Sequence, residues 1–223
     1  MQKAVRKSKM ATINLPSYEE RVLFLGANGS GKTHLATRML SSYPRWIVID
    51  LKGDVRVSED ETIIRSPSDW KWRFADKIIY RPKIEYMDGF YHRYVLRQLY
   101  ERARKKGRKQ PFILYVDESL FLARSGASAM LANLAVATRS LHMGFWCSSQ
   151  RPRNIPVEIR TEAWRWYIFY LMSLEDEKEV SRYTKGQLSI EDLEQGTENY
   201  SFWEIKRGKE RSNVLSIHHY SAI

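Results

Sequence analysis

The fold is decided by residues 26–33, which read Gly26-Ala27-Asn28-Gly29-Ser30-Gly31-Lys32-Thr33. They match the pattern G-x-x-x-x-G-K-[ST], the Walker A motif, a glycine-rich loop whose backbone N–H groups surround phosphate oxygens. An apolar run at 21–25 precedes the loop, and apolar residues at helical spacing follow it at 33–42. This order of strand, loop and helix is the context that a phosphate-binding loop requires.

The polar residues at the end of the loop have predicted tasks. Lys32 is expected to bridge the β- and γ-phosphates of ATP, and the Thr33 hydroxyl is expected to bind Mg²⁺. The helix that begins here directs the positive end of its dipole at the same place. The predicted nucleotide-binding set therefore runs from Gly26 through to His34.

A second motif stands at 112–118, where the apolar run Phe-Ile-Leu-Tyr-Val is followed by Asp117 and Glu118. A strand here carries both acids to the carboxyl edge of a parallel sheet, where ligands bind in this class of fold. Asp117 is expected to hold Mg²⁺ through water, and Glu118 to act as general base on the attacking water. Adjacent acids can also cap a helix, but a phosphate loop in the same chain favours the catalytic interpretation, the Walker B motif.

Strand and helix patterns alternate along the chain. Strands are predicted at 46–50, 62–65, 77–80, 112–116, 145–149, 164–172, 200–205 and 214–217, and helices at 89–107, 127–142 and 175–183. Strands separated by helices imply an α/β fold with a mainly parallel sheet and helices on both faces. We therefore predict a P-loop NTPase fold of the RecA/ASCE type. Residues 13–223 are expected to form a single domain, and the basic segment 1–12 to be flexible.

Composition limits the partners. The 223 residues are 43% hydrophobic, and 37 Lys and Arg against 26 Asp and Glu give a net charge of +11. Such a charge favours polyanions, either nucleic acid or an acidic membrane surface. The single cysteine, Cys147, excludes an intrachain disulfide and is expected to be a small buried hydrophobe. No apolar run approaches the roughly 18 residues that span a bilayer, so we expect no transmembrane insertion.

Two further segments carry a family resemblance. Residues 137–152, ATRSLHMGFWCSSQRP, include Arg139 and Gly144 and end on Gln150-Arg151-Pro152, and residues 46–53 read WIVIDLKG. Both resemble the FtsK-HerA superfamily of DNA-pumping ATPases, in which a strand ending in glutamine lies beside the acidic strand and another ends in Asp followed by Lys-Gly. The resemblance covers about residues 21–183. It implies that Gln150 senses the γ-phosphate and that Asp50 lies near the nucleotide, although Asp50 can equally be read as capping the end of its strand.

Rings are the form in which that superfamily works, commonly as hexamers around duplex DNA. An arginine from one subunit is expected to neutralise charge that develops on the ATP of its neighbour. Arg139 is the best match to this arginine, with Arg124, Arg151 and Arg160 as alternatives.

The length of the chain refines the resemblance, because bacterial chromosome translocases and HerA helicases carry additional domains. A near-minimal motor is similar to the genome-packaging ATPases of membrane-containing icosahedral viruses, which push double-stranded DNA into a preformed capsid. That likeness implies a location in the host-cell cytoplasm or on the virion, with capsid or virion membrane proteins at a packaging vertex as partners. Candidate DNA-binding residues are basic, although a basic helix end is also favoured by the helix dipole alone. They are Arg102, Arg104, Lys105, Lys106, Arg108, Lys109 and Arg124.

Two alternatives stay open. Nucleoside or nucleotide kinases are also P-loop proteins of this length, but the acidic pair and Gln150 favour water over a small acceptor as the nucleophile. A nucleotide-switched export or assembly factor can share the same loops. A kinase should phosphorylate an added nucleoside or nucleotide. An export or assembly factor should hydrolyse ATP at a rate that does not depend on duplex DNA.

Overall fold

One nine-stranded sheet runs through the protein, and its strand order is β3-β4-β2-β5-β6-β1-β7-β8-β9. The structure is a computed structural model that describes residues 14–207 and 215–221. The basic segment 1–12, predicted to be flexible, lies outside the described residues. The strands are β1 (Arg21–Leu25), β2 (Trp46–Asp50), β3 (Thr62–Ile64), β4 (Lys77–Tyr80), β5 (Phe112–Asp117), β6 (Met143–Ser149), β7 (Arg165–Ile168), β8 (Phe202–Arg207) and β9 (Leu215–Tyr220).

The first seven strands are parallel, and β8 and β9 add an antiparallel hairpin at one edge. This confirms the predicted mainly parallel sheet. β1, β2, β5 and β6 are buried along their whole length, as expected of central strands that are covered on both faces. Because β6 lies between β1 and β5, the residue after it emerges between the phosphate loop and the acidic pair.

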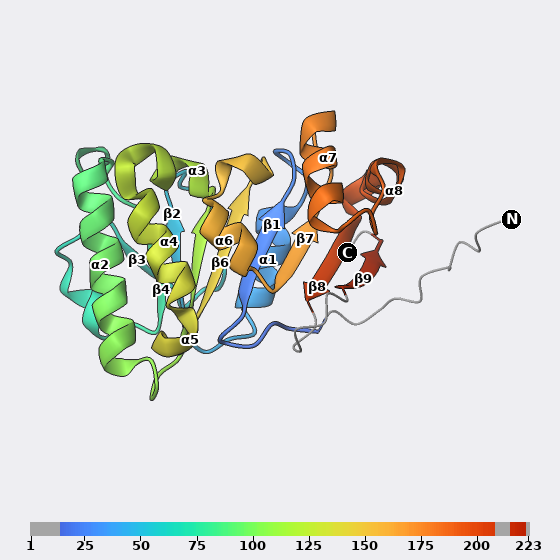
Figure 1. Ribbon diagram of the computed structural model, residues 1–223. Coiled ribbons are helices and arrows are strands. Elements are labelled where there is room, and N and C mark those ends of the chain that lie inside the picture. Colours follow the sequence, from blue (N-terminus) through green and yellow to red (C-terminus); the bar gives the residue numbers. More distant parts are fainter. Residues whose placement is uncertain (1–13, 208–214, 222–223) are drawn as a thin grey trace, which may run out of the picture.

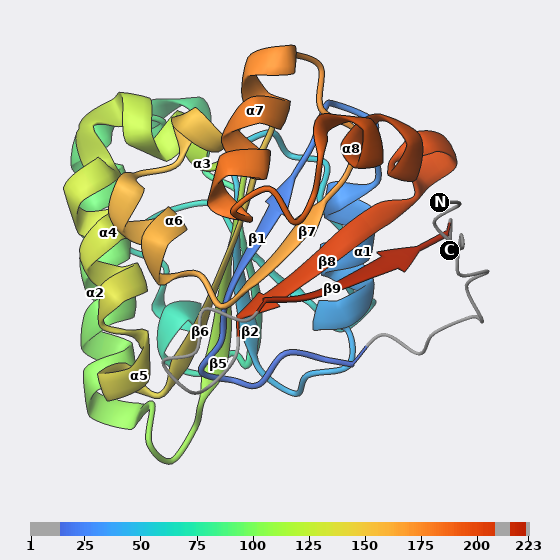
Figure 2. The same ribbon diagram turned by 45° about the vertical axis from the view of Figure 1, so that its right-hand side comes forward.

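Helices cover both faces of the sheet, as predicted (Figures 1 and 2). On one face, α1 (Lys32–Leu40) packs Leu35 and Met39 against Phe24 and Val48. On the other, apolar residues of several helices form a separate core with Leu23 and Val116. The helices of this second side are α2 (Gly89–Lys106), α3 (Ser119–Leu122), α4 (Ser128–Val136), α5 (Thr138–Leu141), α6 (Val157–Glu162), α7 (Leu174–Tyr183) and α8 (Ile190–Gly196).

The helix predicted over 127–142 is wrong in its continuity. A wide helical turn at Ala123–Ala127, with Gly126 in the left-handed region (φ 79°), precedes α4, and Ala137 separates α4 from α5. Ser119–Val136 as a whole has the length and apolar composition of a membrane span, which the sequence pattern did not suggest. In the structure this stretch is interrupted at Gly126, and Leu131 and Leu134 are buried in the sheet's core. We therefore interpret this stretch as part of the helical layer that packs on the sheet.

The carboxyl-terminal part departs most from the prediction. The strand expected at 164–172 ends at Ile168, and the chain then crosses over the phosphate loop, where Phe169 N–H donates to Leu25 O (2.8 Å). Helices α6 and α8 were not predicted. A buried Arg165 ties the terminal hairpin to the sheet, since its guanidinium bonds Glu204 of β8 (2.6 Å) and Glu20 (3.0 Å).

Candidate functional site

The phosphate loop is built by β1 and fixed by its neighbours in the sheet. Gly26 N–H donates to Ser149 O (3.2 Å), and Ala27 N–H donates to Tyr170 O (2.7 Å). Gly26 takes φ 153°, and a Cβ there would stand 2.7 Å from the Phe169 Cβ, so only glycine fits. Gly31 (φ 101°) then begins α1. The start of the loop is therefore held on both sides, by the end of β6 and by the segment directly after β7, the two strands that flank β1.

Lys32 turns back into the loop, and its Nζ donates to Ala27 O (2.6 Å). Burial lowers the pKa of Lys32 to about 8, and the nearby carboxylates of Glu118 and Asp117 act in the opposite direction. A lysine with so little access to water gains a charged partner when a phosphate group enters. The position agrees with the role predicted for Lys32.

Asp117, at the end of β5, is the centre of a hydroxyl cluster. Its Oδ1 accepts hydrogen bonds from Thr33 (2.9 Å), Tyr115 (2.8 Å) and Ser148 (3.0 Å). Burial raises the pKa of Tyr115 well above its ordinary value, so the phenol remains a donor. All three hydroxyls bond Oδ1, so none of them occupies Oδ2, the other oxygen of this carboxylate. The Thr33 hydroxyl and the Asp117 carboxylate are hard oxygen ligands of the kind that Mg²⁺ prefers.

Glu118 follows in a left-handed conformation (φ 57°) and is only 2% exposed. Its Oε2 accepts from Gln150 Nε2 (3.2 Å) and lies 3.5 Å from Lys52 Nζ. Its Oε1 is buried and has no hydrogen-bond partner among the described residues. A buried carboxylate oxygen without a partner is costly, and a water molecule is its natural donor. The arrangement therefore suits a base that acts on water.

These groups surround a cavity of about 340 Å³ at the carboxyl edge of the sheet. Its walls combine the loop, the acidic pair and residues from the segment after β2. The lining residues are Asn28, Gly29, Gly31, Lys32, Thr33, His34, Lys52, Asp54, Asp117, Glu118, Ser148 and Tyr200. Gly26, Ala27 and Ser30 form the body of the loop. The structure thus brings the predicted loop residues and both predicted acids to one place.

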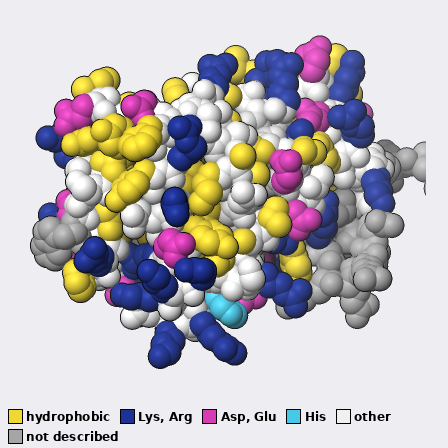
Figure 3. Space-filling view, turned by 60° about the vertical axis from the view of Figure 1, so that its left-hand side comes forward, with side chains coloured by type: hydrophobic (Ala, Val, Ile, Leu, Met, Phe, Trp, Pro, Cys, Tyr) yellow, Lys and Arg dark blue, Asp and Glu magenta, His cyan; other side chains and the backbone are white. Residues whose placement is uncertain are grey.

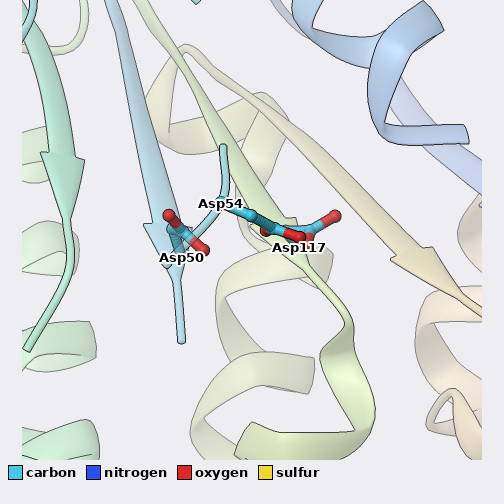
Figure 4. Close-up of side chains that lie close together, drawn as sticks. All are labelled: Asp50, Asp54 and Asp117. Atoms are coloured by element: carbon cyan, nitrogen blue, oxygen red, sulfur yellow. The ribbon is translucent and has the colours of Figure 1, made fainter. Parts of the chain in front are cut away.

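Asp50 lies beside Asp117 in the sheet, but its carboxylate is already bonded. Its two oxygens accept from the N–H groups of Gly53 (2.7 Å) and Val55 (3.1 Å) and from the guanidinium of Arg81 (2.7 Å). Figure 4 shows Asp54 extending toward Asp117 while Asp50 stays on its own strand. Asp50 therefore holds the loop after β2, the capping interpretation, and Asp54 is the acid from this segment that lines the cavity.

The four arginines considered for a neighbouring subunit differ in surroundings. Arg151 bonds Asp176 (2.8 Å), and Arg160 pairs with Glu179, so both are engaged within the chain. Arg139 on α5 and Arg124 before α4 are exposed. The segment with Arg124 follows the carboxyl end of β5, whereas α5, which carries Arg139, directly precedes the amino end of β6 (Figure 1). The role of either in another subunit stays a prediction.

The basic run at the end of α2 divides into two kinds of residue. Arg102 donates to the carbonyls of Trp72 (2.7 Å) and Ala75 (2.9 Å), so its guanidinium is used by the fold. Its contact with DNA stays a prediction, and the structure gives this arginine a role in the fold. The other basic residues of this run are exposed, and we call them the α2-end cluster. Figure 3 shows Lys and Arg side chains gathered in the lower part of the face that it draws. The α2-end cluster consists of Arg104, Lys105, Lys106, Arg108 and Lys109.

Several residues of the site were not predicted. Lys52 and Ser148 stand within quoted motifs without an assigned role, Asp54 directly follows the quoted stretch 46–53, and Tyr200 stands in a segment to which no role was given. Lys52 and Asp54 line the cavity from the loop after β2, whose backbone is held in place by hydrogen bonds to the Asp50 carboxylate. Cys147, predicted to be buried, is fully buried, and burial raises the pKa of its thiol.

Comparison with known proteins gives a likeness at the level of structure. No protein-family model and no curated protein matches the chain. The genome packaging NTPase B204 from Sulfolobus turreted icosahedral virus 2, in complex with AMPPCP, superposes with a TM-score of 0.67 at 16% identity, covering 92% of this chain and 98% of that one. Its complex with ATP-gammaS gives 0.68 at 18% identity, with the same coverage.

A second kind of neighbour is a secretion ATPase. The cytoplasmic domain of the type VII secretion ATPase EccC from Thermomonospora curvata gives a TM-score of 0.59 at 14% identity, over 92% of this chain and 25% of that one. At sequence identities this low, the structural likeness shows a shared fold and nothing more. The chain therefore has the P-loop NTPase fold that it shares with the packaging NTPase B204 and the secretion ATPase EccC.

Proposed function

We propose that the protein hydrolyses ATP with Mg²⁺ and uses the energy to move double-stranded DNA, as in packaging a viral genome into a preformed capsid. The observation that carries the proposal is the position of Glu118. Its buried carboxylate contacts Lys52 and Gln150 on the wall of the phosphate-loop cavity, and one of its oxygens has no hydrogen-bond partner in the part of the chain that the structure describes. The B204 likeness supports the proposal through the fold that the two chains share.

The residues of the cavity divide the reaction between them. Lys32 and the loop N–H groups hold the β- and γ-phosphates, and Glu118 Oε1 accepts the proton of a water that attacks the γ-phosphorus. The new bond joins that water oxygen to phosphorus, and the bond to the β-phosphate oxygen breaks, which releases ADP and phosphate. The Thr33 hydroxyl and, through water, the Asp117 carboxylate would hold Mg²⁺, which would neutralise part of the phosphate charge. Gln150 holds the Glu118 carboxylate and can report whether a γ-phosphate is present.

DNA would contact the chain away from the nucleotide. The α2-end cluster lies between α2 and the amino end of β5, opposite the carboxyl edge of the sheet where the phosphate loop begins (Figure 1). Contacts from Lys and Arg to backbone phosphates give affinity without base readout, which suits a motor that must follow any sequence. The net charge of +11 favours the same partner.

A homo-oligomeric ring, with six subunits as the form common to the superfamily, completes the proposal. Large apolar side chains are exposed around the start of α2 and α3, and Ile84 is 89% and Phe90 65% exposed. Such side chains are candidates for burial between subunits. Arg139 is then the residue proposed to reach the neighbouring ATP. Capsid or virion membrane proteins at a packaging vertex are the further partners, which places the chain in the host cytoplasm or on the virion.

The test is the ATPase rate of the purified chain with and without duplex DNA, measured across a salt series. We expect stimulation by DNA that weakens steeply as salt rises, because phosphate contacts release counterions. Unstimulated, salt-insensitive turnover would contradict translocation and favour the export or assembly factor, for which the EccC likeness is the supporting observation. Transfer of phosphate to an added nucleoside would instead identify a kinase.

A further inference from the structure

A second cavity of about 250 Å³ opens directly beside the phosphate-loop cavity. Three residues, Gly31, His34 and Tyr200, line both. The remaining walls of the second cavity come from the first turn of α1 and from two aromatic residues at the β7 and β8 ends of the sheet. They are Leu35, Phe169 and Phe202.

The two cavities differ in the polarity of their walls, and the three shared residues lie where they meet. Lys32, Asp117 and Glu118 line only the first, whereas the second is apolar and aromatic. Of the described residues that line the second cavity, His34 and Tyr200 alone bring polar side-chain groups. A nucleoside triphosphate has the same polarity, with a charged phosphate chain at one end and a flat base at the other. The pair of cavities therefore matches one nucleotide laid across Gly31.

The aromatic walls are fixed by packing. The Phe169 ring lies 5.0 Å from that of Phe202, and the Phe202 ring stacks on Tyr220 at 5.1 Å with 13° between the planes. A Cβ on Gly31 would stand 3.4 Å from the Phe169 ring and 3.5 Å from the Tyr200 ring. Both rings therefore lie within van der Waals reach of the phosphate loop, and Phe202 of β8 and Tyr220 of β9 pack behind Phe169.

Tyr200 is held in an unusual state for a bulky residue. Its backbone is in the left-handed region (φ 63°), as is that of Asn199 (φ 52°), and its side chain is 64% exposed. Left-handed conformations cost energy in residues other than glycine and gather at functional sites. Here the cost places an exposed phenol ring against the phosphate loop instead of in the core.

We propose that this aromatic cavity binds the base of the nucleotide, with Tyr200 as its stacking partner, and that it recognises a purine by ring area and not by the hydrogen-bonding edge. The inference rests on the proposed nucleotide site and adds the recognition of the base. ATP and GTP then bind nearly alike, because stacking is tolerant of the base's edge groups. Pyrimidine nucleotides bind more weakly because their rings cover less area.

The experiment measures binding to the full chain in the presence of Mg²⁺ by calorimetry, separately from hydrolysis. The ligands are ATP, GTP, UTP and tripolyphosphate, which has no base. For the wild type we expect dissociation constants for ATP and GTP within about threefold, and weaker binding of UTP. Tyr200→Ala should weaken ATP and GTP about tenfold or more, the effect of losing an aromatic partner of a base, and leave tripolyphosphate unchanged. The matched control, Tyr200→Phe, keeps the ring and should bind ATP within about twofold of the wild type.

Three results would overturn the inference. They are unchanged ATP affinity in Tyr200→Ala, an equal loss for tripolyphosphate and ATP, and strong wild-type preference for ATP over GTP. Melting temperatures identify any variant that fails to fold, and Tyr200→Gly, which removes the ring and relieves the left-handed strain, then replaces Tyr200→Ala. Wild type that binds purine nucleotides through Tyr200 without hydrolysing them would contradict the proposed function and leave this inference intact.

Discussion

Lys52 Nζ lies 3.5 Å from Glu118 Oε2, and this contact joins the loop after β2 to the acidic end of β5. The Lys52 side chain is 31% exposed and the Glu118 side chain 2%. A partly exposed lysine that lines the cavity therefore pairs with a buried carboxylate. The relationship gives Lys52 a positioning role that can be tested.

Lys52→Ala should slow ATP hydrolysis about 100-fold, because displacing a catalytic group by about 1 Å has an effect of that size. ATP affinity should change much less than the rate constant, since the loop and Lys32 are untouched. Single-turnover kinetics together with equilibrium binding separate the two quantities. Lys52→Arg, which keeps the charge, should retain more activity than the alanine variant, and an unaltered rate in Lys52→Ala would refute the role.

Lys32→Ala should raise the dissociation constant for ATP by about tenfold or more, the range expected when a charge-assisted hydrogen bond is lost. Lys178→Ala, on the exposed face of α7, removes the same charge far from the loop and serves as control. Equilibrium titration with Mg-ATP makes the comparison. Equal affinities in the two variants would count against the assignment of the loop.

Arg139→Ala should bind ATP normally and lose hydrolysis by about 10³-fold or more in the assembled ring, as for other arginines supplied by a neighbour. Mixing Arg139→Ala subunits with Lys32→Ala subunits should restore part of the activity, because some interfaces then combine an intact loop with an intact arginine. Arg124→Ala is the comparison at the opposite edge of the sheet. Loss of activity in Arg124→Ala alone would transfer the role to that residue.

Replacing Lys105, Lys106, Arg108 and Lys109 together by alanine should weaken duplex DNA binding and make its salt dependence shallower by about one unit per lost contact. Arg102→Ala should behave differently, since its guanidinium bonds two carbonyls within the fold. It should lower the free energy of unfolding by about 1–3 kcal/mol and leave the salt dependence unchanged. Denaturant titrations and DNA binding at several salt concentrations test the pair, and a DNA defect confined to Arg102→Ala would reverse the assignment.

The parts of the fold that the sequence predicted are those with local patterns. The phosphate loop, the apolar strand before Asp117 and the strand before Gln150 each carry a motif or a continuous apolar run, and the sheet places them together. Their relative position follows from the general rule that parallel strands end at one edge. Local chemistry was therefore sufficient for the loop and the acids.

Long side chains and unusual backbone were beyond that reasoning. Lys52 lies in the loop after β2, whose backbone is held by the hydrogen bond from Gly53 N–H to Asp50, and from there its side chain contacts Glu118. The Arg102 guanidinium donates to two backbone carbonyls about 30 residues away in the chain. Tyr200 lines the phosphate-loop cavity through a positive φ in the short helical turn before β8, a segment with no motif of its own. Each depends on contacts between segments far apart in the chain, which no local pattern records.

Retention and hydrolysis of Mg-ATP by the wild type and by Glu118→Gln test the central claim most directly. The substitution keeps the size of the side chain and removes the base, so the variant should retain ATP with near wild-type affinity and release phosphate about 10²- to 10⁴-fold more slowly. Wild-type turnover in Glu118→Gln, or a wild type that binds no nucleoside triphosphate in the presence of magnesium, would contradict the account.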